Sequence, residues 1–205
     1  MPKAVKVKRV RPAEVRRQAI LDAALDEFAA SGFAAARLED IAKRAGVAKG
    51  TIYLYFKDKE ALFQQLVSSS LVPIVSTLAV SSGEQSVRAI LEMFAKTVIE
   101  QVLRTKRAQI LRLIIAEGNR FPAIAEFYFR EVVQRGMTGM SMLLAAGVAR
   151  GEISATSLPK FPQIVAAPLL AAVIWQSLFE PHSPLDVEDM FKTHIDLICG
   201  PRRPI

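Results

Sequence analysis

Apolar residues recur at helical spacing through nearly all of this 205-residue chain, and no segment shows the strict alternation and glycine-rich turns of a β-sheet. Between residues 13 and 30, for example, Ile20, Ala24 and Phe28 share one helix face, and Ser31-Gly32 marks its end. A longer helix is expected to begin near Asp58, a good N-cap residue. The pattern predicts an all-α fold, with further helices over 38–45, 49–56, 84–104, 107–118, 123–150, 159–180 and 187–199.

The clearest linker is Ser81-Ser82-Gly83, which predicts a domain boundary between about 70 and 83. Residues 1–11 are basic and lack the apolar core of a signal peptide, so we expect a disordered basic arm. Three regions are therefore expected: the arm 1–11, an N-terminal domain over 12–74, and a larger helical domain over 75–205.

The positive charge is concentrated at the N-terminal end. Residues 1–67 hold 13 Lys and Arg against 8 Asp and Glu, whereas residues 68–205 hold 14 against 12. A basic first third favours a polyanionic partner there, although a solvated basic surface would have the same composition.

Two short helices joined at Val47-Ala48 follow the long amphipathic helix and predict a helix-turn-helix over about 37–56. In such a motif the first short helix lies across the DNA backbone, and the second enters the major groove. Gly46 stands where a left-handed helix cap is wanted. The motif predicts a three-helix DNA-binding domain.

The second short helix opens with residues suited to a nucleic acid. Lys49 supplies charge, Gly50 permits close approach of the backbone to a phosphate, and Thr51 supplies a hydroxyl for a phosphate or a base. Tyr53 and Tyr55 carry hydroxyls on rigid rings, although both could equally be rim residues of an amphipathic helix.

Two lysines open the next helix. Lys57 and Lys59 stand where free backbone N–H groups also favour a phosphate. Ile52 and Phe56, four residues apart, are expected to face the core.

The stretch from Ile41 to Leu62 closely resembles the DNA-binding signature of the TetR/AcrR family of bacterial transcription regulators, and the resemblance covers roughly residues 14–74. It implies that Thr51, Tyr53, Tyr55 and Lys59 contact the DNA backbone and that Lys49, Gly50 and Thr51 open the recognition helix.

Two positions depart from the family pattern. The hydroxyl residue that often opens the first short helix is replaced by Ala36-Arg37, and the Ser that often precedes the recognition helix is Ala48. We expect Arg37 to reach the phosphate that the missing hydroxyl would have contacted. The expected DNA-binding residues are Arg37, Lys49, Gly50, Thr51, Tyr53, Tyr55, Lys57 and Lys59.

Residues 84–199 contain no phosphate loop, dinucleotide fingerprint, metal-ligand spacing or catalytic constellation, so we expect no enzyme, cofactor or metal.

A plain packed core would explain the abundant apolar residues of this region, but the resemblance implies a cavity for a small apolar or amphipathic effector. Replacing Gly118 or Ala116 by Leu is expected to block it. The candidate effector-binding residues are Met93, Phe94, Ile110, Leu113, Ile114, Glu117, Asn119, Phe127, Tyr128, Met137, Met140 and Trp175.

The last two helices carry more apolar surface than a monomer would bury, which predicts a homodimer joined through them.

The uncharged run 161–179 contains Pro162 and Pro168 and is interpreted as a buried helix, not a membrane span. The single cysteine, Cys199, excludes an intramolecular disulfide and fits a reducing compartment. His194 is expected at an interface or core rim.

The favoured function is a cytoplasmic, ligand-responsive, homodimeric repressor that binds a palindromic operator in double-stranded DNA. The alternatives are a DNA-coating protein without sequence preference, an enzyme in the C-terminal domain, and a membrane-bound helical protein anchored by residues 161–179. A DNA-coating protein is disfavoured by the specific motif over 49–59 and by the large, nearly neutral C-terminal domain.

Overall fold

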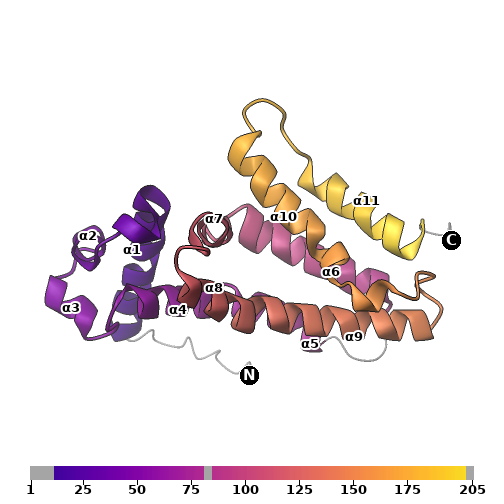
Figure 1. Ribbon diagram of the computed structural model, residues 1–205, viewed down its shortest axis with the longest axis horizontal. Helices are drawn as coiled ribbons and strands as arrows, with labels where there is room; N and C mark the ends of the chain where they lie inside the picture. Colours follow the sequence, from indigo (N-terminus) through magenta and orange to yellow (C-terminus); the bar gives the residue numbers. More distant parts are fainter. Residues whose placement is uncertain (1–11, 81–84, 202–205) are drawn as a thin grey trace, which may run out of the picture. The chain divides into compact units, whose positions relative to one another are not determined.

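A computed structural model of the chain describes residues 12–80 and 85–201 (Figure 1). The described residues form helices and no β-strand, as the periodicity predicts. The expected basic arm 1–11 lies outside the described residues. Contacts divide the chain between Leu66 and Val67 into two compact units, a few residues before the boundary expected from the linker.

The first unit contains α1 and the two short helices. These helices are α1 (Pro12–Ala35), α2 (Leu38–Arg44) and α3 (Lys49–Tyr53), followed by the first part of α4 (Lys59–Ser70). Gly32 interrupts α1 at a φ of 74°, close to the expected helix end, and Gly46 follows α2 at a φ of 67°. Both values lie in the left-handed region that glycine adopts without strain. Helix α3 is shorter than expected, because Leu54 and Tyr55 already form a turn.

An aromatic cluster holds the first unit together. Phe28, Phe33 and Phe63 are almost completely buried, and their ring centroids lie 5.3–6.2 Å apart. Ile52 and Phe56 are buried as expected. These contacts orient the short helices, which have too few residues to be stable alone.

A buried carboxylate also ties α1 to α2. Glu27 accepts hydrogen bonds from the Ser31 hydroxyl at 2.8 Å and from the Arg44 guanidinium at 3.0 Å. These two partners lower the pKa of Glu27 below its usual value. At the start of α4, the Ala61 N–H donates to the Asp58 carboxylate at 2.7 Å, which confirms Asp58 as the N-cap.

The second unit is a larger helical bundle, in which α10 and α11 form a helical hairpin (Figure 1). Two helices that the periodicity predicts as single contain π-helical turns, since i→i+5 hydrogen bonds are a local variation that an apolar pattern does not reveal. After the last residues of α4, its elements are α5 (Val72–Val80), α6 (Val87–Val98), π turn η1 (Ile99–Leu103), α7 (Ala108–Glu117), α8 (Pro122–Tyr128), π turn η2 (Phe129–Gln134), α9 (Arg135–Ala149), 3₁₀ turn η3 (Leu158–Lys160), α10 (Gln163–Leu178) and α11 (Val187–Cys199).

One described stretch, Lys59–Leu78, is long and apolar enough by composition to cross a membrane. Core helices of water-soluble proteins pass the same test, and Leu62, Phe63 and Val67 in this stretch are fully buried within the protein. Helix α10, which lies in the run 161–179 considered above as a membrane anchor, is too short to span a membrane by the same test.

Candidate nucleic-acid interface and effector cavity

The turn between α2 and α3 presents the opening of α3 to solvent. The Val47 N–H donates to the Ala42 carbonyl at 3.0 Å and closes the turn, while Ile41 and Ile52 bury the inner faces of both helices. Ala48 and Arg37, which cap α3 and α2, make no side-chain cap bond, as the departures from the family pattern predict.

The structure places most of the expected DNA-binding residues at the surface of this unit. Tyr53 is 51% exposed, and the Lys57 side chain is 83% exposed. Arg37, Lys49 and Gly50 are exposed too, whereas Thr51, Tyr55 and Lys59 are half-buried. The arrangement brings cations, hydroxyls and bare backbone to the surface along α3 and the loop that follows it.

Three of the expected phosphate ligands have partners inside the protein, and the first, Lys57, pairs with the neighbouring Asp58 carboxylate at 3.7 Å. Lys49 forms an ion pair with Glu39 of α2, which lowers the pKa of Glu39 and raises that of Lys49. Lys59 donates to the carbonyls of Phe33 and Ala34 at 2.8 and 2.9 Å, and its ammonium lies 4.8 Å from the Phe33 ring centroid. A phosphate would have to compete with these partners.

Leu54 is a surface residue that the sequence reasoning missed. Its side chain is 82% exposed at the end of α3, beside Tyr53. A large apolar side chain in that position has no core to join, and apolar groups can contact the methyl group of thymine in the major groove. Its place after Tyr53 in a short recognition helix was the available signal.

Gly50 offers a test that separates folding from DNA binding. A Cβ at Gly50 would meet no protein atom within 4 Å, so Gly50→Ala is expected to leave stability unchanged or raise it by up to ~1 kcal/mol. If the bare backbone approaches a phosphate, the same variant should bind DNA about 2- to 12-fold more weakly, the cost of one hydrogen bond. Urea unfolding and fluorescence anisotropy measure the two effects.

The matched control is Gly46→Ala. A methyl group at Gly46 would also meet open space, but the φ of 67° makes any side chain strained, so this variant should lose about 1 kcal/mol of stability. Unchanged DNA affinity in Gly50→Ala would show that no close backbone approach occurs there.

Lys59→Met should report on both of the roles open to this lysine. Loss of the carbonyl contacts at the end of α1 is expected to cost up to ~1 kcal/mol of stability, since a cation there offsets the helix dipole. Loss of a phosphate contact should lower the salt slope of DNA binding by about one. Lys57→Met, at a highly exposed lysine, should change the slope without the stability loss. A slope that stays constant in Lys59→Met would make Lys59 a structural cap alone.

The second unit contains an apolar cavity of about 220 Å³. Residues from α5 to α11 line it, including Val75 and Leu78 of α5, and none of its lining residues is Lys, Arg, Asp or Glu. Four of the expected effector-binding residues reach it: Phe94, Tyr128, Met137 and Met140.

The other eight candidates do not line this cavity. Ile110 and Leu113 are buried elsewhere in the core, and the Trp175 indole, 37% exposed, donates to the Ser183 carbonyl at 2.6 Å. Their positions follow from packing that the helical pattern alone does not specify. Of the remaining five, Met93 and Asn119 are exposed, and Ile114, Glu117 and Phe127 are half-buried.

The cavity also contains residues that the sequence reasoning missed. His194, expected at an interface or core rim, lies on its wall together with Gln163 and Gly136. Only the long-range packing of α9, α10 and α11 brings these three residues together.

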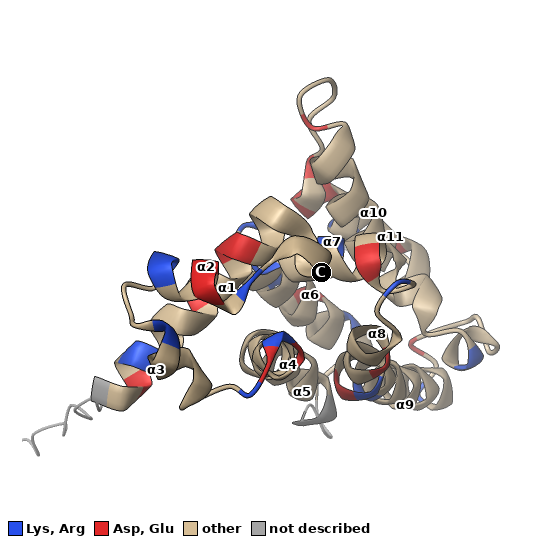
Figure 2. Cartoon of the chain, turned by 60° about the vertical axis from the view of Figure 1, so that its left-hand side comes forward, with Lys and Arg blue, Asp and Glu red and all other residues tan. Residues whose placement is uncertain are grey.

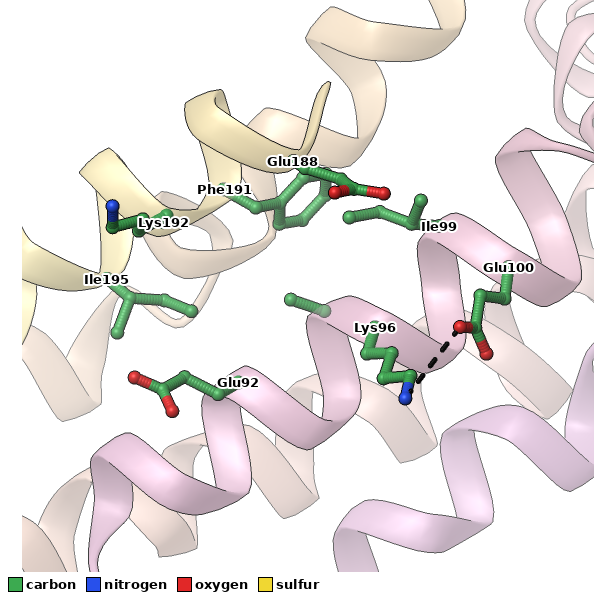
Figure 3. Close-up of a pocket in the computed structure, with 9 residues that line it drawn as sticks. Glu92, Lys96, Ile99, Glu100, Glu188, Phe191, Lys192 and Ile195 are labelled. Atoms are coloured by element: carbon green, nitrogen blue, oxygen red, sulfur yellow. Dashed lines mark ion pairs between the residues drawn. The ribbon is translucent and has the colours of Figure 1, made fainter. Parts of the chain in front are cut away.

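A groove of about 330 Å³ between α6 and α11 adjoins the cavity (Figure 3). Ala95, Phe191 and Ile195 line both spaces. Charged side chains rim the groove, with Lys96 and Glu100 paired at 3.9 Å. The remaining charged residues of the rim are Glu92, Glu188 and Lys192.

A helix-turn-helix whose second helix opens at the surface, followed along the chain by a helical domain with an apolar cavity, is typical of a DNA-binding regulator. Residues 20–66 match the tetR family of bacterial regulatory proteins, and residues 89–194 match the AefR-like transcriptional repressor C-terminal domain. The chain belongs to the TetR family of DNA-binding transcriptional regulators. This family is one of regulators and not of enzymes.

Individual relatives agree with this assignment. The chain is 44% identical to the regulator RutR of Escherichia coli over 71 residues, which cover 33% of this chain and about a third, 34%, of RutR. It is 31% identical to the uncharacterized regulator YdeS of Bacillus subtilis, over 71% of this chain and 72% of YdeS. The fold matches Bacillus subtilis FadR in complex with stearoyl-CoA, with a TM-score of 0.67 at 19% identity, over 89% of this chain and 97% of FadR.

Proposed function

We propose that the protein is a ligand-responsive homodimeric repressor that binds a near-palindromic operator and is released by a small apolar or amphipathic effector. The observation that carries this proposal is the apolar cavity of the second unit. The match to the C-terminal domain of AefR-like repressors supports the sign of regulation. Like the family's regulators in general, it would act in the cytoplasm.

Chain connectivity offers a route from cavity to DNA. Helix α4 begins in the first unit, where Leu62 and Phe63 are buried, and ends in the second. Helix α5 follows after one residue, and its Val75 and Leu78 line the cavity. An effector that displaces α5 would therefore act on the helix that supports the DNA-binding domain, taken as residues 12–74.

The dimer is supported by the surface of α10. This helix contains no charged residue and is uncharged along its length in Figure 2. Several large apolar side chains of α10 and its flanking residues remain exposed in the single chain, namely Phe161, Ile164, Leu170, Ile174, Trp175, Leu178 and Phe179. A surface of this kind favours a twofold partner, and two recognition helices would then read two half-sites.

The test is selection of duplexes from a random pool, followed by titration of the selected site and a shuffled control at equal salt. We expect a near-palindromic site bound about 10³-fold or more tightly than the control. Tyr53→Phe should weaken binding to both duplexes alike, because phosphate contacts carry no sequence information, whereas Thr51→Ala should weaken mainly the selected site. Equal affinity for both duplexes would favour a DNA-coating protein.

A further inference from the structure

Apart from the exposed Gln163 amide, two polar groups on the cavity wall lack partners inside the protein. Within the described part of the chain, the Tyr128 hydroxyl makes no hydrogen bond, and the His194 Nε2 is buried without one. An unpaired polar group in an apolar setting is costly, and a ligand that pairs with it recovers that cost.

Both groups are uncharged near neutral pH. Burial raises the pKa of Tyr128 to about 12. Burial also lowers the pKa of His194, while the backbone carbonyl of Ile164 opposes this to a smaller extent. The cavity lining therefore offers neither a cation for an acid nor a carboxylate for an amine.

The surrounding grooves add little attraction for an anion. The groove of Figure 3 has three carboxylates and two ammonium groups on its rim. A second groove shares Val75 and Leu78 with the cavity and contains three arginines. Arg130 and Arg135 of this groove both pair with Glu131, and Arg150 pairs with Glu152.

We propose that the effector is an uncharged small molecule with an apolar body and a hydroxyl group that hydrogen-bonds to Tyr128 and His194. The inference rests on the proposed function and narrows its ligand. A hydroxyl both donates and accepts, so it satisfies a tyrosine hydroxyl and either tautomer of a histidine. At about 220 Å³ the cavity is smaller than the ~300–1,000 Å³ of typical drug-sized sites, which favours a small ligand.

The backbone at Tyr128 supports a ligand site. Tyr128 is the last residue of α8, and π turn η2 follows at once. Val132 and Val133 of this π turn line the cavity. Single π-helical turns within longer helices are found frequently at functional sites, because the extra residue redirects the side chains that follow.

The experiment compares four probes on the full-length protein by calorimetry and by release of the selected operator. Propylbenzene, 4-propylphenol and 4-propylbenzoate share one apolar body and differ only in the polar group, and octanoyl-CoA represents an anionic acyl thioester. We expect 4-propylphenol to bind most tightly. Tyr128→Phe should weaken 4-propylphenol about three- to tenfold and leave propylbenzene unchanged.

His194→Leu should show the same selectivity for the phenol. The control is Met142→Ala, which should leave ligand binding unaltered because Met142 is 69% exposed on α9 and does not line the cavity. Tightest binding of 4-propylbenzoate or octanoyl-CoA, with release of the operator, would overturn the uncharged ligand but retain a ligand-responsive regulator. An equal loss for phenol and hydrocarbon in Tyr128→Phe would overturn the role of its hydroxyl. If none of the probes binds the cavity or releases DNA, both the inference and the ligand response in the proposed function fail.

Discussion

Effector-saturated protein is expected to bind its operator about 5- to 150-fold more weakly than the free protein, which corresponds to a coupling free energy of about 1–3 kcal/mol. The effector must bind the DNA-incompetent arrangement more tightly than the DNA-competent one, because a ligand with equal affinity for both does not change the equilibrium between them. Linkage requires DNA to weaken effector binding by the same factor. Titration of 4-propylphenol into free protein and into the preformed DNA complex measures both sides of this relation.

Gly136→Leu should abolish this response while DNA binding persists. Gly136 lies on the cavity wall in α9, and a Cβ there would meet Val75 at 3.5 Å, an ordinary contact. The longer leucine side chain would occupy the space of the ligand. Gly136→Ala is the control, since it adds one methyl group at that contact and should remain responsive.

The two positions chosen from the sequence for this purpose are unsuitable. A Cβ at Gly118 would lie 2.6 Å from the Ile114 carbonyl oxygen, so a leucine there would disturb the backbone, and Ala116 is exposed. Neither residue lines the cavity. Should the effector bind free and DNA-bound protein with the same Kd, the allosteric interpretation fails and a DNA-binding dimer remains.

Ile174→Asp combined with Leu178→Asp is expected to convert the proposed dimer into a folded monomer and to weaken operator binding by several orders of magnitude. Both side chains are exposed in the single chain, Leu178 at 61%, so the substitutions should spare the fold of the protomer. In a dimer they would bury four carboxylates in an apolar interface, which is strongly unfavourable. A monomer binds one half-site and loses the avidity of two linked recognition helices.

Sedimentation equilibrium and operator titration measure the two effects together. Met142→Asp is the control, because Met142 is 69% exposed on α9 and outside the proposed interface. A wild-type protein that sediments as a monomer at micromolar concentration, or a double variant that stays dimeric, would contradict an interface through α10.

The sequence by itself determined the features that depend on neighbouring residues. Helical periodicity predicted the helices. The residue types at Asp58 and Gly46 predicted an N-cap and a left-handed backbone conformation, respectively. Each of these features depends on interactions within one or two helical turns. The second short helix was equally readable, because Lys49, Gly50 and Tyr53 lie within five consecutive residues. Its length was overestimated by the residues that form the turn after Tyr53.

Only the tertiary structure decided which buried residues border the cavity. Ile110 and Met140 have the same apolar character and helical spacing, yet Met140 faces the void and Ile110 does not. The partners of Lys59 are likewise carbonyls at the end of another helix, 25 and 26 residues away in sequence. Amphipathic spacing predicts that a side chain faces the core. The packing of distant helices determines whether that side chain contacts another side chain, a carbonyl or the cavity.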